Sequence, residues 1–151
     1  MITTSTDWKR MSKEVFLDTA GFIALGNADD EFHQQADILN RELISSRVKL
    51  ITTDDILNEV ANAFSKPINR HIAIDLIDSF QASASEERTE VVQVGEKLWD
   101  RGFELYKNRP DKDWGLIDCI SFVLMGERRI TQAFSSDHHF EQAGFVKLLL
   151  K

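Results

Sequence analysis

An acidic residue interrupts the most apolar stretch of the chain. Between Trp114 and Met125 almost every residue after Gly115 is apolar, apart from Asp118 and Ser121. An apolar run of this length, followed by charged residues, predicts a buried helix with Asp118 and Ser121 on one side, about one turn apart. Burying a carboxylate costs free energy unless another group pairs with it. A partner for Asp118 must therefore come from elsewhere in the chain.

Three further acids could share the site of Asp118. Asp18 and Asp137 each follow a predicted strand, and Glu59 lies at the edge of the apolar face of a predicted helix. Each position also has a structural explanation. The aspartates at the strand ends could cap helices, Glu59 could be solvated, and Asp118 could stabilise the first turn of its helix through the helix dipole. If the four acids instead converge, they repel one another unless a cation lies between them.

Clustered carboxylates of this kind suit hard divalent cations and phosphoryl chemistry. Mg²⁺ binds oxygen ligands at about 2.1 Å and keeps several of its waters. Two such ions about 3.5–4 Å apart stabilise an in-line displacement at phosphorus, and one of them lowers the pKa of the attacking water. This chemistry requires no serine, cysteine or histidine nucleophile.

Strands and helices alternate along the chain, with mostly short connections. This pattern favours a parallel sheet with helices on both faces. Such sheets bind ligands at the carboxyl ends of their strands, near a switch in strand order, and both Asp18 and Asp137 are predicted at such ends. Strands are expected at about residues 14–18, 48–52, 89–94, 130–134 and 145–150, and helices at about 19–25, 30–47, 55–64, 67–82, 95–106, 115–125 and 136–143.

Length and composition are those of one soluble globular domain. The chain has 151 residues, of which 42% are hydrophobic and 28% charged. We expect a domain over residues 14–151 and a loose extension over residues 1–13, where Met11 is an alternative start. The extension has no apolar core of a secretory signal, and no apolar run reaches the roughly 18 residues of a membrane span. The single cysteine, Cys119, fits a reducing cytoplasm.

The net charge of −7 argues against nucleic-acid binding through bulk positive charge. That objection weakens if several of the acids are gathered in one pocket, because bound divalent cations would neutralise the pocket. Local contacts with RNA phosphates could still come from Arg109, Lys112 or His138, which stand close in sequence to predicted site residues. An ordinary solvated charge cluster is the preferred explanation of the first two. Of the adjacent His138 and His139, one is expected to face solvent and the other to pack.

Four motifs, in this order, resemble the PIN domain family, which includes the ribonuclease toxins of bacterial toxin–antitoxin pairs. The resemblance extends over nearly the whole chain, from about residue 14 to 150. No single motif is specific, but four in the right order are. They are Val15–Thr19 (VFLDT), Thr52–Thr53 leading to Glu59, Asp113–Phe122 (DWGLIDCISF) and Phe134–Phe140 (FSSDHHF).

The resemblance implies a three-layer α/β/α sandwich with a mainly parallel central sheet. It also implies a metal-dependent endoribonuclease, in which an acidic quartet binds one or two Mg²⁺ or Mn²⁺ ions and hydrolyses RNA. The quartet carried over by position is Asp18, Glu59, Asp118 and Asp137. Residues expected to support it are Thr19, Asp113, Ser121 and Ser136. Where the family often has a hydroxyl residue before the third acid, this chain has Ile117, and Ser135 and Ser136 stand where it often has threonine.

The same resemblance implies RNA as substrate, an antitoxin protein as partner and a homodimeric assembly; the cytoplasmic location is expected from the single cysteine. The alternative is a non-catalytic PIN-like module that binds RNA or protein, but the intact quartet favours catalysis. A haloacid-dehalogenase-like phosphatase would need a second aspartate where this chain has Ala20. A phosphate-accepting receiver domain would leave Glu59 and Asp118 without a role.

Overall fold

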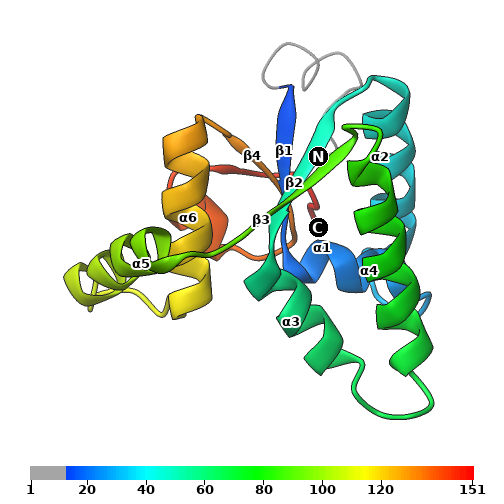
Figure 1. Cartoon of the computed structure of the whole chain (residues 1–151), viewed down its shortest axis with the longest axis horizontal. Coiled ribbons are helices and arrows are strands. Elements are labelled where there is room, and N and C mark those ends of the chain that lie inside the picture. The colour runs from blue at the N-terminus through cyan, green and yellow to red at the C-terminus, as the bar shows by residue number, and fades with distance from the viewer. Residues whose placement is uncertain (1–12) are drawn as a thin grey trace.

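Strands and helices alternate through the computed structural model, which describes residues 13–151 (Figure 1). The predicted alternation is confirmed. The strands are β1 (Glu14–Leu17), β2 (Lys49–Thr53), β3 (Thr89–Val92), β4 (Gln132–Phe134) and β5 (Val146–Lys147). The helices are α1 (Thr19–Gly26), α2 (His33–Ser45), α3 (Asp54–Ala63), α4 (Arg70–Ala84), α5 (Glu96–Asn108), α6 (Leu116–Arg128) and α7 (His139–Gln142).

The five strands form one parallel sheet in the order β3-β2-β1-β4-β5. The chain moves outward from β1 through β2 to β3, and then returns to place β4 on the other side of β1. The strand order therefore reverses between β1 and β4, and the carboxyl ends of these two strands border the position where such sheets bind ligands. Asp18 follows β1 directly, and Asp137 follows β4 after a two-residue link.

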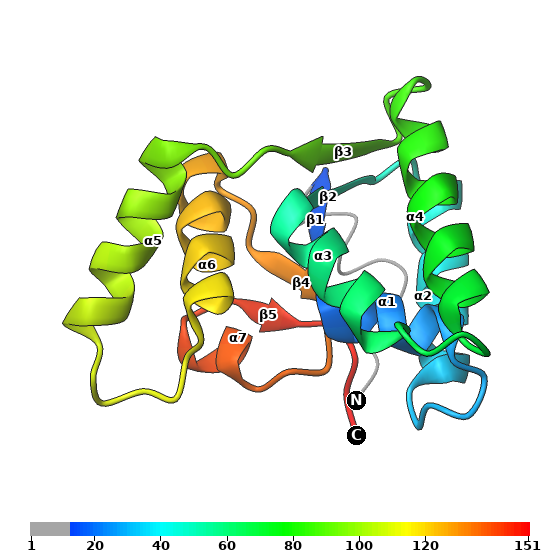
Figure 2. The ribbon, with the colours of Figure 1, turned by 60° about the horizontal axis from the view of Figure 1, so that its bottom comes forward.

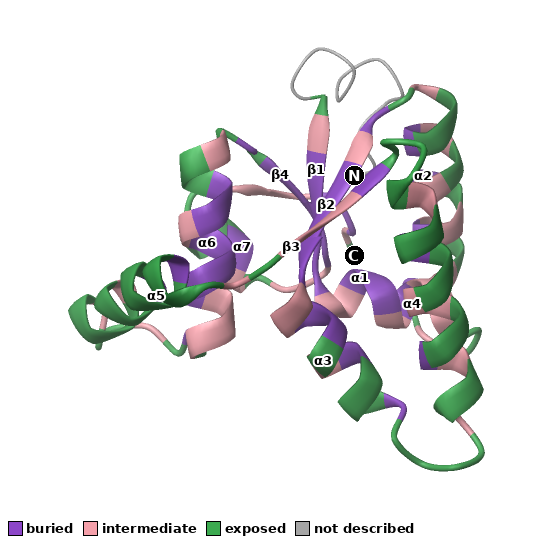
Figure 3. Ribbon diagram, in the orientation of Figure 1, coloured by how far each residue is buried: buried purple, intermediate pink, exposed green. Residues whose placement is uncertain are grey.

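Helices cover both faces of the sheet, as predicted for a three-layer sandwich. Figures 1 and 2 both show α2 and α4 on one side of the sheet and α5 and α6 on the other. The central strand is the most apolar, and Val15, Phe16 and Leu17 are all buried. In Figure 3 the buried residues gather at the middle of the sheet and along α6, whereas α5 is largely exposed. Burial on both faces explains why these strands read as continuous apolar runs.

The approach of α5 to α6 depends on a glycine. A Cβ atom at Gly102 would overlap the side chain of Ile120, so only glycine lets the two helices pack this closely. Leu98, also on α5, is buried together with Ile120. This packing holds α6 against the rest of the domain and thereby fixes the position of its first turn, which carries Asp118.

The predicted boundaries differ from the structure mainly at the ends of elements. The last strand is only Val146–Lys147, although 145–150 was expected, because an apolar run does not by itself show where pairing stops. Helix α4 begins at Arg70, three residues after Pro67. The expected extension at 1–13 lies outside the described residues except for Lys13, whose carbonyl accepts a hydrogen bond from the Lys49 amide (2.9 Å). Over the described part, every helix is too short or too polar to cross a membrane.

Candidate active site

The first acid, Asp18, is buried at the carboxyl end of β1, with only 5% of its surface exposed. It precedes α1 but makes no side-chain capping bond to that helix, so the capping explanation does not account for it. Its Oδ2 instead accepts a hydrogen bond from Ser135 Oγ at 3.0 Å. The pKa of Asp18 is raised to about 7, chiefly by burial; the charges of Asp118 and Asp137 add to this rise, and the hydrogen bond from Ser135 opposes it.

The second acid, Glu59, reaches the same region from α3. Thr53 begins this helix by accepting a hydrogen bond from the Ile56 amide (3.1 Å). Glu59 is half-buried, and its Oε1 accepts a hydrogen bond from Thr19 Oγ1 at 2.7 Å. Burial raises the pKa of Glu59, and the nearby charge of Asp118 adds to the rise. A glutamate that is bonded to α1 in this way is not simply solvated.

The third acid, Asp118, lies in the first turn of α6, where its Oδ2 accepts a hydrogen bond from the Gly115 amide (3.0 Å). Asp118 therefore caps its own helix, in addition to lying in the first turn, where the sequence interpretation gave it a helix-dipole role. Its side chain is nevertheless 22% exposed, and burial followed by the charge of Asp137 raises its pKa. The helix cap and the acid cluster thus use the same carboxylate.

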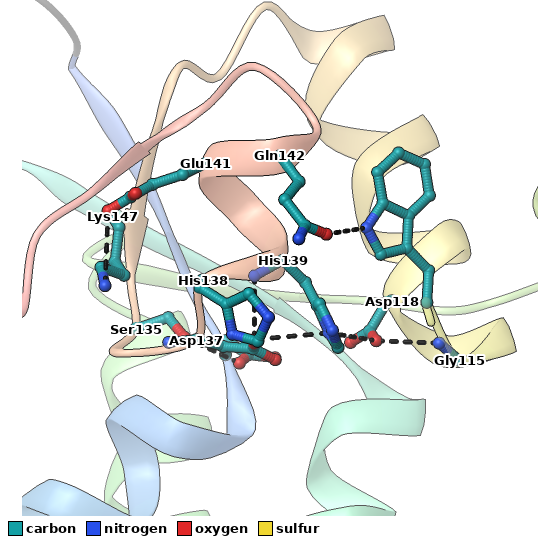
Figure 4. Close-up of polar contacts among 11 residues, drawn as sticks. Gly115, Asp118, Ser135, Asp137, His138, His139, Glu141, Gln142 and Lys147 are labelled. Atoms are coloured by element: carbon teal, nitrogen blue, oxygen red, sulfur yellow. Dashed lines mark hydrogen bonds and ion pairs between the residues drawn. The ribbon is translucent and has the colours of Figure 1, made fainter. Parts of the chain in front are cut away.

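The fourth acid, Asp137, is fixed by the backbone on both sides. Its amide donates to Ser135 Oγ (3.0 Å), and its Oδ1 accepts a hydrogen bond from the His139 amide (2.9 Å). Figure 4 shows the ring of His139 between this carboxylate and that of Asp118. His139 Nδ1 lies 3.4 Å from Asp137 Oδ1 and 3.4 Å from Asp118 Oδ2.

The four acids thus come from four different parts of the chain and lie at the carboxyl edge of the sheet. Asp118 and Asp137 each raise the pKa of Asp18, and Asp118 raises that of Glu59, so the carboxylates interact electrostatically. Carboxylate oxygens are the donors that a hard divalent cation prefers, and the charge of such a cation would relieve their mutual repulsion. The buried His139 Nδ1, which makes no hydrogen bond within residues 13–151, also faces this cluster.

Of the four residues expected to support the acids, one contacts an acid and three do not. Thr19 contacts an acid directly. Ser121 is buried, but its hydroxyl has no hydrogen-bond partner in the described chain and does not orient Asp118. Ser136 is half-buried and bonds none of the acids through its side chain, and Asp113 is exposed.

Of the residues expected to meet RNA, His138 is the most open, with 68% of its side chain exposed. Arg109 makes two hydrogen bonds of 3.0 Å to Asp111, and its guanidinium lies 5.0 Å from the centre of the Trp114 ring. Lys112 is half-buried on the same loop. The arginine is therefore already engaged within its own loop.

Two residues that contact the acids were not among the expected site residues, Ser135 and His139. Ser135 was noted only as one of two adjacent serines, and burial, which decides between them, is a tertiary property: Ser135 is fully buried. His139 was considered together with His138, and one of the two was expected to pack. The sequence does not tell which of two adjacent histidines turns inward.

The acids do not line the cavity that lies between two of the helices. That cavity, of about 1030 Å³, lies between α2 and α4, with Ile44, Ile72 and Leu76 among its apolar residues and none of the four acids. The acid cluster instead lies at an open edge of the sheet. An open site of this kind can receive one segment of a long polymer, whereas an enclosed cavity selects a small molecule.

Comparisons with known proteins agree with this architecture. The family model described as the PIN domain matches residues 15–146. The 23S rRNA-specific endonuclease VapC20 of Mycobacterium tuberculosis is 26% identical over 137 residues, which cover 89% of this chain and 97% of that protein. The crystal structure of M. tuberculosis VapC20, described as a sarcin–ricin loop cleaving toxin, superposes with a TM-score of 0.74 at 25% identity and covers 87% of this chain and 96% of that one. The chain belongs to the PIN domain family.

Proposed function

We propose that this protein is a metal-dependent endoribonuclease that hydrolyses RNA phosphodiester bonds through Asp18, Glu59, Asp118 and Asp137. The convergence of these four acids at one open edge of the sheet is the observation that carries the proposal. Membership of the PIN domain family supports it, as does the likeness to VapC20, whose description as a 23S rRNA-specific endonuclease names RNA as its substrate. The proposal does not extend to the ribosomal target of that relative.

The residues of this chain contribute by holding the acids in place before substrate arrives. Ser135 orients Asp18, Thr19 orients Glu59, and the Gly115 amide orients Asp118. Bound at these carboxylates, one or two Mg²⁺ or Mn²⁺ ions would supply charge neutralisation and a water of lowered pKa. The free-energy cost of bringing the four carboxylates together arises during folding. The acids therefore do not need to reorganise during the reaction.

The reaction we propose is hydrolysis by in-line attack of water on phosphorus. The P–O3′ bond breaks, and the products carry a 3′-hydroxyl and a 5′-phosphate. The ribose 2′-hydroxyl takes no part. Exposed His138 and the half-buried Lys112 are the side chains we expect to meet phosphates beside the acids, whereas Arg109 would first have to leave Asp111.

The partners we propose follow from the same relative, which is described as a toxin. A ribonuclease toxin acting inside its own cell requires restraint, and we infer an antitoxin protein partner and a cytoplasmic location. We also infer a homodimer. Co-expression with the product of a neighbouring gene tests the antitoxin, and light scattering coupled to size exclusion measures the mass of the purified protein in solution.

The test of the function is an RNA cleavage assay with the purified protein in Mg²⁺, in Mn²⁺ and in EDTA, beside the Asp118→Asn variant. Asparagine keeps the shape of the side chain and removes its charge. We expect cleavage in either metal, none in EDTA and none by the variant, with circular dichroism showing that the variant is folded. A folded parent that binds RNA without cutting it in either metal would favour the alternative, a non-catalytic RNA-binding module.

A further inference from the structure

Within residues 13–151, His139 is the only side chain that places a nitrogen between two of the four acids. Its Nδ1 lies 3.4 Å from Asp118 Oδ2 and 3.4 Å from Asp137 Oδ1, yet makes no hydrogen bond to either. The side chain is 17% exposed, and Figure 4 shows its ring pointing into the space between the two carboxylates. The His138 ring packs against its outer side, with the two ring centres 4.4 Å apart.

This arrangement requires a hydrogen-bond donor or a cation near Nδ1. A neutral ring with its proton on the other nitrogen would direct the Nδ1 lone pair toward two carboxylate oxygens, which are acceptors only. Buried acceptors that face one another without a donor are costly. Either a proton on Nδ1 or a bound metal ion would relieve this cost.

The distance from Nδ1 to each aspartate oxygen is compatible with a shared metal ion. Two donors bound at about 2.1 Å to one ion lie roughly 3.0 to 3.4 Å apart, depending on the angle between them. His139 Nδ1 lies at such a distance from one oxygen of each aspartate. Among the described residues, the group whose ligand atoms all lie within 4.8 Å of one another is Asp137, His138 and His139, without Asp118, so His138 is the rival nitrogen donor.

We propose that His139 supplies an imidazole nitrogen ligand to the cation bound by Asp118 and Asp137, and that this ligand gives the site a preference for Mn²⁺ over Mg²⁺. The inference rests on the proposed function, because it concerns the same metal. Imidazole nitrogen is a borderline donor that suits transition metals, whereas Mg²⁺ prefers oxygen. Loss of the ligand should weaken Mn²⁺ binding about 10- to 100-fold and Mg²⁺ binding less.

The direct test is pulsed electron paramagnetic resonance of Mn²⁺ bound to the full chain, which detects nitrogen nuclei coordinated to the metal. We expect the parent to show ¹⁴N modulation from one imidazole. Labelling the parent with [¹⁵N]histidine should change that signal to ¹⁵N, without any substitution that could affect folding. The signal should disappear in His139→Ala and persist in His138→Ala. A parent without nitrogen modulation, or a signal lost only in His138→Ala, would overturn the assignment.

Calorimetric titration with Mn²⁺ and with Mg²⁺ separates this inference from the proposed function. If Asp118→Asn abolishes Mn²⁺ binding but the bound Mn²⁺ of the parent shows no nitrogen, the carboxylate site stands and the His139 ligand is rejected. If the parent binds neither ion, with or without a non-cleavable RNA analogue, the metal-dependent function itself fails. A ratio of Mn²⁺ to Mg²⁺ affinity that is the same in the parent and in His139→Ala would also reject the inference.

Discussion

Ser135 Oγ donates a hydrogen bond to Asp18 Oδ2 at 3.0 Å and accepts one from the Asp137 amide at 3.0 Å. One hydroxyl thus joins the first acid of the cluster to the fourth. It can do so because β1 and β4 are neighbours, with Leu17 paired to Phe134, so the residues that follow each strand meet at the same edge. Asp18 and Ser135 are both buried. The spacing between the two aspartates is therefore set by the sheet.

Ser135→Ala should weaken metal binding without unfolding the protein. Removing the hydroxyl leaves Asp18 without its side-chain donor and frees the Asp137 amide, and losing such a supporting contact typically costs about 10- to 100-fold in metal affinity. Calorimetric titration with Mn²⁺ measures the change. Ser136→Ala is the matched comparison, because Ser136 makes no side-chain hydrogen bond in the described chain. This variant should bind Mn²⁺ with the affinity of the parent. Equal losses in both variants would contradict the role of Ser135.

The stability of the metal-free protein should depend on pH through Asp18. The pKa of this group is raised from 3.8 to about 7 by burial, so the folded state holds the proton more tightly than the unfolded chain does. The contribution of the protonated Asp18 carboxyl to the free energy of unfolding is complete below pH 3.8 and is lost as the pH rises through 7. We expect urea unfolding in EDTA to show the parent losing stability relative to Asp18→Asn between pH 4 and pH 8, by a few kcal/mol at most. Parallel profiles for the two proteins would show that Asp18 does not titrate in this way.

Thr19→Val should impair the site, while Thr19→Ser should not. Valine has the shape of threonine but cannot donate to Glu59 Oε1, whereas serine can. Loss of this hydrogen bond costs about 1 kcal/mol in stability and leaves Glu59 free to adopt other rotamers. We expect a fall of about tenfold in the rate of RNA cleavage under single-turnover conditions for the valine variant. Equal rates for the two variants would separate Thr19 from the mechanism.

Arg128 should contribute to stability and not to catalysis. At the far end of α6 it donates to both oxygens of Glu90 (2.7 and 3.0 Å) and to Glu14 (2.9 Å). The hydrogen bond from Arg128 lowers the pKa of Glu90 from 4.5 to about 2. The stabilisation is therefore present above pH 4.5 and is lost as the pH falls toward 2.

The matching experiment compares the free energy of unfolding of the parent with that of Arg128→Met. Because these side chains are about a third exposed, solvent screening limits the expected loss to about 1 kcal/mol at pH 7. The difference should shrink as the pH is lowered below 4.5. RNA cleavage at pH 7 should be unchanged. A variant that folds normally but no longer cleaves RNA would place Arg128 at the substrate.

The fold was predictable because its signals are local and repeated. Apolar strands alternate with amphipathic helices, and this pattern predicts a parallel sheet covered on both faces. The exact ends of β5 and α4 were not predictable, since they depend on which backbone groups find partners. The order of the strands could not be read from periodicity either. The structure shows it to be β3-β2-β1-β4-β5.

The candidate site was predictable in its acids and not in the residues that hold them. A carboxylate in an apolar helix, as at Asp118, is visible in the sequence because it violates the local pattern. Ser135 and His139 do not break any local hydrophobic pattern, and each has a neighbour of the same residue type, Ser136 and His138. Only the packed structure shows which member of each pair turns inward.

The most direct test of the proposed chemistry is the origin of the oxygen in the cleaved product. A single turnover of RNA with the parent protein and Mn²⁺ in H₂¹⁸O, followed by mass spectrometry of the fragments, should show one ¹⁸O in the terminal 5′-phosphate and a 3′-hydroxyl on the other fragment. Asp18→Asn should yield no such fragments. Fragments that end in a 2′,3′-cyclic phosphate would show attack by the ribose 2′-hydroxyl and contradict hydrolysis by the acid cluster.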